Sequence, residues 1–126
     1  MSIKIRSFAN SGVIEQERMS LKVLANTDVG AYAVVFTDRV DNGPTPGNKI
    51  AYWFPDAKVE AGDLIILYTK EGKRRTKKLI TGRTAHFFYW GLDKAIWDGE
   101  NIACVLLSVD KWEWKIPPSV DSFPDK

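Results

Sequence analysis

The segment from Ile50 to Tyr68, IAYWFPDAKVEAGDLIILY, constrains the fold of this chain more than any other. It contains two runs of strand length that are rich in β-branched and aromatic residues, which favours a sheet core. Pro55 ends the first run because proline has no N–H to donate to a ladder. Residues 60–63 supply a turn before the second run, and Pro55 and Gly62 together exclude a helix. The segment therefore predicts two strands joined by a compact corner.

Other short apolar runs separated by turn signals extend this prediction to an all-β chain of about eight or nine strands. The cleanest period of two lies at residues 111–116, where Trp112, Trp114 and Ile116 are expected to face inward. Further strands are expected at 2–8, 19–24, 31–37, 79–81 and 102–108, with an aromatic strand at 86–90. The run at 31–37 is nearly all apolar, which is typical of a central strand covered on both sides.

The length of 126 residues indicates one domain, which we place at residues 1–116 as a β-sandwich followed by a flexible tail at 117–126. Five Trp, four Tyr and six Phe suit a sandwich filled by large flat side chains. With Cys104 as the only cysteine, an internal disulfide is excluded. The chain has neither a signal-peptide pattern nor the ~20 apolar residues of a membrane helix, so a cytoplasmic protein is expected.

The positive charge is concentrated in one strip. Seven of the 18 basic residues lie between positions 70 and 83, together with one of the 16 acidic residues. Two interpretations stay open: the strip lines a phosphate backbone, or it is a solvated loop whose cations keep an edge strand from pairing with other chains. The strip itself contains no aromatic residue to stack bases. Its cations are Lys70, Lys73, Arg74, Arg75, Lys77, Lys78 and Arg83.

Three blocks of the sequence resemble the lamin tail domain family. The early block, at 18–38, has a strand, an Asn-containing polar turn at 25–28 and a second strand. The middle block has Tyr52-Trp53-Phe54-Pro55 with Ala61-Gly62 downstream. The closing block has Tyr89-Trp90, then Trp97, then an apolar strand at 101–107.

The resemblance covers about residues 18–115 and implies an immunoglobulin-like β-sandwich of the lamin tail domain type. Members of that family serve as interaction and scaffolding modules, some with nucleic-acid contact, and they offer no catalytic residues to transfer. The strip at 70–78 is more basic than is usual for the family, and residues 1–126 show no coiled-coil, nuclease or signal-peptide pattern.

Single residues offer few further sites. His86 is the only histidine, which leaves too few parts for a Ser-His-Asp or multi-histidine site, so a hydrogen-bonded structural role is expected. Cys104 shares strand parity with Ile102 and Leu106 and is interpreted as a small core residue. Trp97 is either a plug over one end of the sandwich, as the resemblance suggests, or an exposed anchor for a partner.

Two acidic groups complete the candidates. Asp38, Asp41 and Asn42 have a spacing seen in Ca²⁺ loops but lack the remaining ligands, so turn formation explains them better. The carboxylates near Trp97 are interpreted as a polar loop. They are Asp93, Asp98 and Glu100.

The sequence therefore predicts a non-enzymatic interaction or scaffolding module, with no catalytic, cofactor or metal residue, no small-molecule substrate and no membrane contact. Its partner is expected to be another protein or a second copy, met through loops and a sheet edge. The alternative is a nucleic-acid-binding module that uses the basic strip at 70–83.

Overall fold

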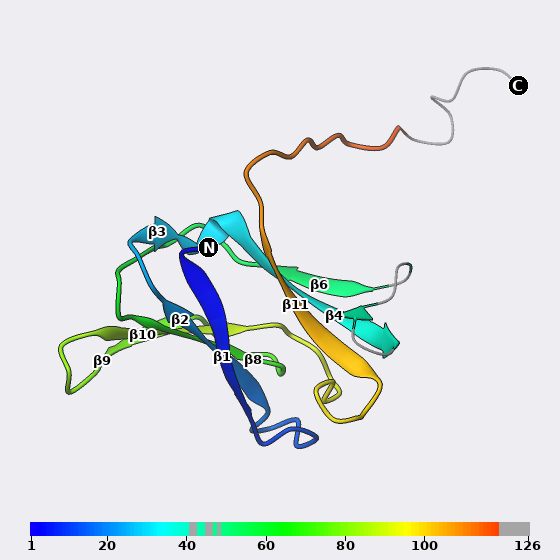
Figure 1. Ribbon diagram of the computed structural model, residues 1–126, viewed down its shortest axis with the longest axis horizontal. Coiled ribbons are helices and arrows are strands. Elements are labelled where there is room, and N and C mark those ends of the chain that lie inside the picture. The colour runs from blue at the N-terminus through cyan, green and yellow to red at the C-terminus, as the bar shows by residue number, and fades with distance from the viewer. Residues whose placement is uncertain (41–42, 45–46, 48, 119–126) are drawn as a thin grey trace, which may run out of the picture.

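The computed structural model describes residues 1–40, 43–44, 47 and 49–118, and within them it contains eleven strands and one short 3₁₀ helix. The strands form two main sheets that face each other as a β-sandwich, with a small third sheet beside them (Figure 1). The all-β prediction is thus confirmed. The eleven strands exceed the eight or nine expected because β3, β5 and β7 are only two residues long. No helix in these residues is long and apolar enough to cross a bilayer.

The first layer is a five-stranded sheet in the order β1-β2-β8-β10-β9. Adjacent strands in this sheet are antiparallel except β8 and β10, which run parallel, with Ile66 opposite Phe87. The bounds are β1 Ile3–Ala9, β2 Arg18–Val23, β8 Leu64–Tyr68, β9 Arg75–Lys78 and β10 Thr84–Tyr89.

The second layer is built around β4, which pairs with β11 on one side and β6 on the other. A short strand, β5, pairs with the far end of β4, and the third sheet pairs β3 with β7. The bounds are β4 Tyr32–Val40, β5 Gly43–Pro44, β6 Ile50–Trp53, β11 Ile102–Ser108, β3 Thr27–Asp28 and β7 Lys58–Val59, with the 3₁₀ helix η1 at Val29–Ala31.

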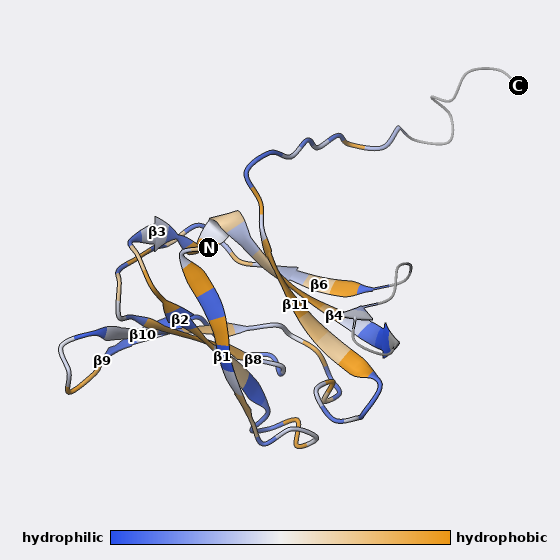
Figure 2. Ribbon diagram, in the orientation of Figure 1, coloured by the Kyte–Doolittle hydropathy of each residue, from blue (hydrophilic) through white to orange (hydrophobic). Residues whose placement is uncertain are grey.

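The core fills the space between the two layers. Strand β1 alternates between hydrophobic and hydrophilic along its length (Figure 2), and its Ile3 is fully buried. Phe54, from the segment after β6, packs edge-on against Phe88 of β10 with the ring centroids 5.1 Å apart. Trp97 is 8% exposed and contacts the rings of Phe8, Phe36 and Trp90. Trp97 is therefore a plug over one end of the core.

The two strands predicted from the segment 50–68 are both present, but they lie in different sheets. The corner between them crosses from one layer to the other. At its end Gly62 has a φ of 94°, a left-handed conformation that glycine adopts without strain, and the Asp63 N–H donates to the Glu60 carbonyl at 2.9 Å. The segment thus connects the two layers.

Two predicted strands are wrong. Residues 79–81 form a turn, in which the Gly82 N–H donates to the Leu79 carbonyl, and Ile80 is fully exposed. The edge strand is β9, inside the basic strip itself. Residues 111–116 belong to no strand and do not face the core. Of the predicted tail, residues 119–126 lie outside the described part of the chain.

Glu17 is a buried carboxylate that ties three distant segments together. Its side chain is fully buried and accepts hydrogen bonds from the Thr69 hydroxyl and from three backbone N–H groups. Those groups belong to Gly12, Ile96 and Trp97, at 2.9–3.0 Å. Burial alone would raise the pKa of Glu17, but these four donors together lower it below the ordinary value. Glu17 therefore holds the loop that carries Trp97 against the sheet.

Asp63 and His86 form a second buried polar pair, at the opposite end of the five-stranded sheet. The Asp63 carboxylate accepts from the Glu60 and Thr84 N–H groups at 3.0 Å and lies 2.9 Å from His86 Nε2. Burial raises the pKa of Asp63, but the bonds from Glu60, His86 and Thr84 outweigh it and leave the pKa lowered. The prediction that His86 is a hydrogen-bonded structural residue is confirmed.

We expect Glu17→Gln to destabilise the protein by about 2 kcal/mol, because the amide of Gln replaces an acceptor oxygen by a donor and leaves buried N–H groups unpaired. Urea unfolding followed by Trp fluorescence measures this change. Glu15→Gln is the matched control, since Glu15 is exposed and its only recorded ion pair is a 3.6 Å contact with Lys70. Equal stability of the two variants would contradict the structural role of Glu17.

We expect the free energy of unfolding to fall as the pH drops below the ordinary carboxyl values of 4.5 and 3.8. Glu17 and Asp63 have lowered pKa values when folded, so the unfolded chain takes up protons first and acid favours it. Their contribution is fully present above the ordinary carboxyl pKa values and is lost as the pH falls through the lowered folded-state pKa values of the two groups. Urea midpoints across this range test it. The decline should be shallower in Glu17→Gln, and a midpoint independent of pH would refute the assignment.

Candidate functional site

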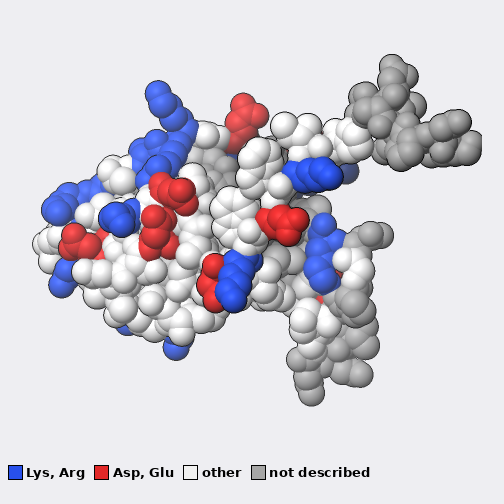
Figure 3. Space-filling view, turned by 90° about the horizontal axis from the view of Figure 1, so that it is seen from above, with Lys and Arg blue, Asp and Glu red and all other residues white. Residues whose placement is uncertain are grey.

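The basic strip predicted from the sequence lies on β9 and its flanks, at one edge of the five-stranded sheet. Every residue from Glu71 to Lys78 is exposed. Lys and Arg side chains gather at the end of the molecule opposite the C-terminal segment (Figure 3). Of the seven predicted cations, Arg75, Lys77 and Lys78 are on β9, Lys70, Lys73 and Arg74 precede it, and Arg83 follows the turn. The structure thus places the strip along an edge strand.

Two cations of the strip lie against aromatic rings of the neighbouring strand β10. The Arg75 guanidinium carbon is 3.9 Å from the centroid of Phe87, the residue opposite it in the register. The same atom of Arg74 lies 5.0 Å from the ring of Phe88, on the core side. Each contact contributes about 0.5–1 kcal/mol at an exposed site. These two guanidiniums are therefore positioned by the sheet rather than extended into solvent.

Aromatic rings line the outward face of this sheet beside the strip. Tyr68 stacks on Tyr89 with the centroids 5.2 Å apart and the planes at 12°, and lies 6.5 Å from Phe87. Gly72 packs so closely on Tyr89 that a Cβ there would come within 2.4 Å of a ring carbon. Lys70 covers Tyr68 from 5.6 Å. Because the ring faces are occupied by neighbours, this surface offers cations more readily than free stacking faces.

The sequence analysis missed a second surface, which we call the apolar face. It is the outward side of β11, β4 and β6, and the strand register arranges it in two rows, Leu107–Ala33–Trp53 and Val105–Val35–Ala51. Ala33 and Val35 are buried beneath their neighbours, whereas Leu107 is 43% and Trp53 48% exposed. The Trp53 indole is fixed by a 2.7 Å hydrogen bond to the Gly30 carbonyl. Outward faces of antiparallel sheets are ordinarily polar.

The signal for this face was present in the sequence. In 102–107 and 31–36 the odd-numbered and the even-numbered residues, which face opposite sides of a strand, are both apolar. This pattern indicates a sheet covered on both sides. One side is the core, formed by Ile102, Cys104 and Leu106 with the alternate residues of β4. The other side is the apolar face, whose flanks no other element of the described chain buries.

A third feature is the segment 109–118, which we call the C-terminal arm. Its last recorded backbone bond to the sandwich joins the Val109 N–H to the Ala31 carbonyl, and the chain then runs away from both sheets (Figure 1). Trp112, Trp114 and Ile116 are 62%, 73% and 75% exposed, which corrects their predicted inward orientation. A period of two shows that one side of an extended segment is apolar, but it does not show that its own chain covers that side.

The C-terminal arm begins on the apolar face. The Trp112 ring lies edge-on against the ring of Trp53, with 5.1 Å between the centroids. Beyond Trp112, the side chains of Trp114 and Ile116 have no recorded ring contact or hydrogen bond in the described chain. Exposed tryptophans therefore continue from the apolar face onto the arm.

A groove of about 600 Å³ opens between β1 and β11, the free edges of the two main sheets. Its lining is mainly aliphatic and reaches the apolar face at Val105. The lining residues include Ile3, Ile5, Leu24, Pro44, Val105 and Leu106. This groove has the character of a contact surface for apolar side chains, because it brings together few polar groups.

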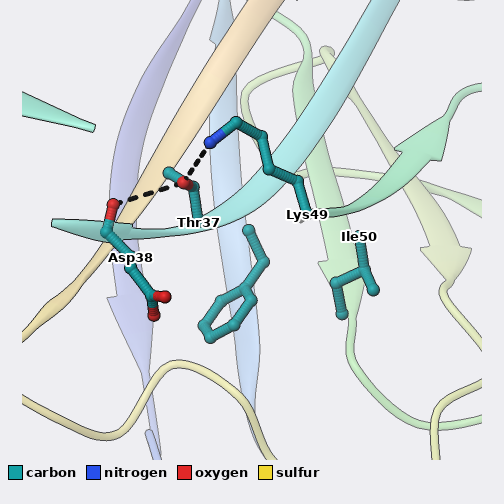
Figure 4. A pocket seen from close by; sticks show the side chains of 5 residues that line it. Thr37, Asp38, Lys49 and Ile50 are labelled. Atoms are coloured by element: carbon teal, nitrogen blue, oxygen red, sulfur yellow. Dashed lines mark hydrogen bonds between the residues drawn. The ribbon is translucent and has the colours of Figure 1, made fainter. Parts of the chain in front are cut away.

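A smaller pocket, of about 220 Å³, lies between β4 and the start of β6 (Figure 4). Lys49 Nζ donates to the Thr37 hydroxyl at 2.6 Å, and that hydroxyl donates to the Asp38 carbonyl at 3.2 Å. Asp38 belongs to the candidate Ca²⁺ group, but Asp41 and Asn42 lie outside the described residues. Within the part of the chain that the structure describes, no three His, Cys, Asp or Glu side chains are grouped to hold a metal ion.

The remaining candidates have structural positions. Cys104 packs against the core beside Met19, as predicted, and burial raises the pKa of its thiol to about 12. The thiol is thus protonated at neutral pH and is a poor nucleophile. The loop carboxylates Asp93, Asp98 and Glu100 are all exposed.

Comparison with known proteins adds no family to these observations. No protein-family model matches the chain, and no curated protein sequence matches it. The assignment to the lamin tail domain family therefore stays a prediction.

Proposed function

We propose that this protein is a non-enzymatic interaction module that binds a protein surface through the apolar face and the C-terminal arm. The observation that carries the proposal is the set of exposed apolar side chains on the apolar face and the arm, which the contact between Trp53 and Trp112 joins. They are Leu107, Trp53, Trp112, Trp114 and Ile116. The sequence pointed to loops and a sheet edge, whereas these residues favour a sheet face and an extended segment.

The chemistry of these side chains supports the proposal. A tryptophan buries roughly 150–250 Å² when it is covered, and tryptophans are enriched among the residues that dominate binding energy at interfaces. Contiguous apolar patches larger than a few hundred Å² are rare on monomers and mark interaction sites. The apolar face and the arm together present three exposed tryptophans to solvent.

The buried ionisable groups also support a binding role. The single histidine is engaged by Asp63 in the interior, and Glu17 is occupied by four donors. These groups stabilise the fold instead of facing an open cavity. The resemblance to lamin tail domains, whose members are interaction and scaffolding modules, agrees with the same proposal.

Photo-crosslinking tests this function directly. A benzophenone amino acid is placed at Trp114 in one variant and at Ile80 in a control. Ile80 is also apolar and fully exposed, and it belongs to the turn between β9 and β10, which lies far from the C-terminal arm (Figure 1). Illumination of cells that produce each variant should give adducts of discrete mass from position 114 and few from position 80. Equal yields at the two positions would count against an interface on the arm.

A second candidate function is the binding of nucleic-acid phosphates by the basic strip. The specific observation in its favour is that five of the seven cations lie between Lys73 and Lys78 along one edge strand, where all of them are exposed. The occupied faces of Tyr68 and Tyr89 favour phosphate contacts over base stacking. Affinity would therefore depend on salt and hardly on sequence.

Fluorescence anisotropy with random-sequence single-stranded DNA at several salt concentrations tests this candidate. Neutralising two cations with Lys73→Gln and Lys77→Gln should reduce the log–log salt slope by about 1.4, at ~0.7 per phosphate contact on a single strand. The control changes Lys58 and Lys94 to Gln, which removes the same charge from exposed positions elsewhere. An unchanged slope in the strip variant, or an equal loss in the control, would eliminate the strip as a phosphate site.

A further inference from the structure

The C-terminal arm has the pattern of a strand whose sheet lies in another molecule. Trp112, Trp114 and Ile116 alternate with Lys111, Glu113 and Lys115, so an extended arm has one apolar and one charged side. All six side chains are exposed. Such a segment is stabilised only when a surface covers its apolar side, and beyond Trp112 the described part of its own chain supplies none.

The arm cannot place Trp114 and Ile116 on the apolar face of its own copy without reversing direction. Trp112 already lies at Trp53, on the outer flank of the sheet formed by β11, β4 and β6. From there the chain leads away from the sandwich (Figure 1). A reversal needs turn residues such as Gly, Asn or Asp, and residues 113–116 contain none of them. The covering surface therefore belongs to another molecule.

The apolar face of a second copy fits this requirement. On β11 of this face Leu107 is 43% exposed, and Val105 beside it is partly buried. The seven residues of extended arm from Trp112 to Pro118 span about 20 Å, whereas three strands place their outer members about 10 Å apart. An arm that starts at the flank of one face is thus long enough to cross the opposing face of a partner.

We infer that two copies of this chain form a two-fold symmetric dimer in which each C-terminal arm lies across the apolar face of the other. The inference rests on the proposed function and names its partner. In a two-fold interface the same patch serves both subunits, so each copy must carry both the segment that binds and the surface that receives it. The contact between Trp53 and Trp112 places both on the same side of the molecule. One interface then covers both exposed apolar features.

Sedimentation velocity of the full chain, from low micromolar concentration to about 1 mM, tests the dimer. We expect a species of twice the 14.2 kDa chain mass. Trp114→Asp alters the arm and Leu107→Lys alters the face, and each should raise the dissociation constant about tenfold or more. Ile80→Asp is the control, because it changes an apolar side chain that is more exposed than either Trp114 or Leu107 and lies outside the interface. Circular dichroism of each variant checks that the sandwich is intact.

Mixing the two variants distinguishes the exchange of arms between two copies, in which each arm lies on the apolar face of the other copy, from other modes of association. A mixed dimer keeps one intact contact, between the unchanged arm of the Leu107→Lys copy and the unchanged face of the Trp114→Asp copy. Its second contact pairs Asp with Lys. We therefore expect the mixture to recover dimer that neither variant forms alone at the same concentration. Dimers that do not respond to both substitutions, or no recovery on mixing, would overturn the exchange.

The outcome for the proposed function is independent of this result. A wild-type protein that stays monomeric up to about 1 mM overturns the second copy as partner. If position 114 then still crosslinks in cells to a species of another mass, the interaction module stands with a different partner. If position 114 gives no adduct above the control at Ile80, the proposed function itself falls.

Discussion

The hydrogen bonds to the buried Glu17 carboxylate determine how one end of this sandwich closes. Four donors from the turn before β2, the end of β8 and the loop before β11 converge on its two oxygens. A buried charge is tolerated only when it is fully hydrogen-bonded. The three segments must therefore be arranged so that all four donors reach the carboxylate oxygens. This arrangement also fixes the position of Trp97, because the Trp97 backbone N–H is one of the donors and the Trp97 ring covers the core.

At the other end, Asp63 performs a related task with different chemistry. It directly precedes β8, and its carboxylate accepts a hydrogen bond from the backbone N–H of Thr84, where the parallel strand β10 begins. Parallel neighbours cannot be joined by a tight hairpin, so the register of β10 against β8 depends on contacts of this kind. Between the two carboxylates lies the apolar interior, in which Phe54 of one layer meets Phe88 of the other. Polar anchors thus position the ends while aromatic packing joins the layers.

Much of this fold could be predicted from the sequence, because short-range patterns define its strands. The strand at 64–68, the turn at Gly62 and the core position of Cys104 follow from alternation and turn chemistry alone. Glu17 was missed although its parity with Met19 and Leu21 marks it as inward-facing. A glutamate on the core side is uncommon enough that parity by itself does not identify it, and three of its four donors lie 52 to 80 residues away.

The candidate sites were predicted less completely, for a physical reason. The cluster of cations at 70–83 can be read from the sequence, but the ring beneath Arg75 depends on which strand pairs with β9. The arm was assigned to the core because its alternation is that of a buried strand. Alternation reports one apolar side and is the same whether the covering sheet is in the same chain or in another.

The central position of β4 has a consequence for how the chain folds. Its partners β5, β6 and β11 all follow it in the sequence, and the register pairs Tyr32 with Ser108. Until synthesis reaches Ser108, β4 has an unpaired edge and apolar residues on both sides. Contacts of such large sequence separation form slowly and leave strand edges exposed in the meantime. The second layer is thus completed only after Ser108 has been made, and until then the unpaired edge and the apolar sides of β4 expose the nascent chain to aggregation.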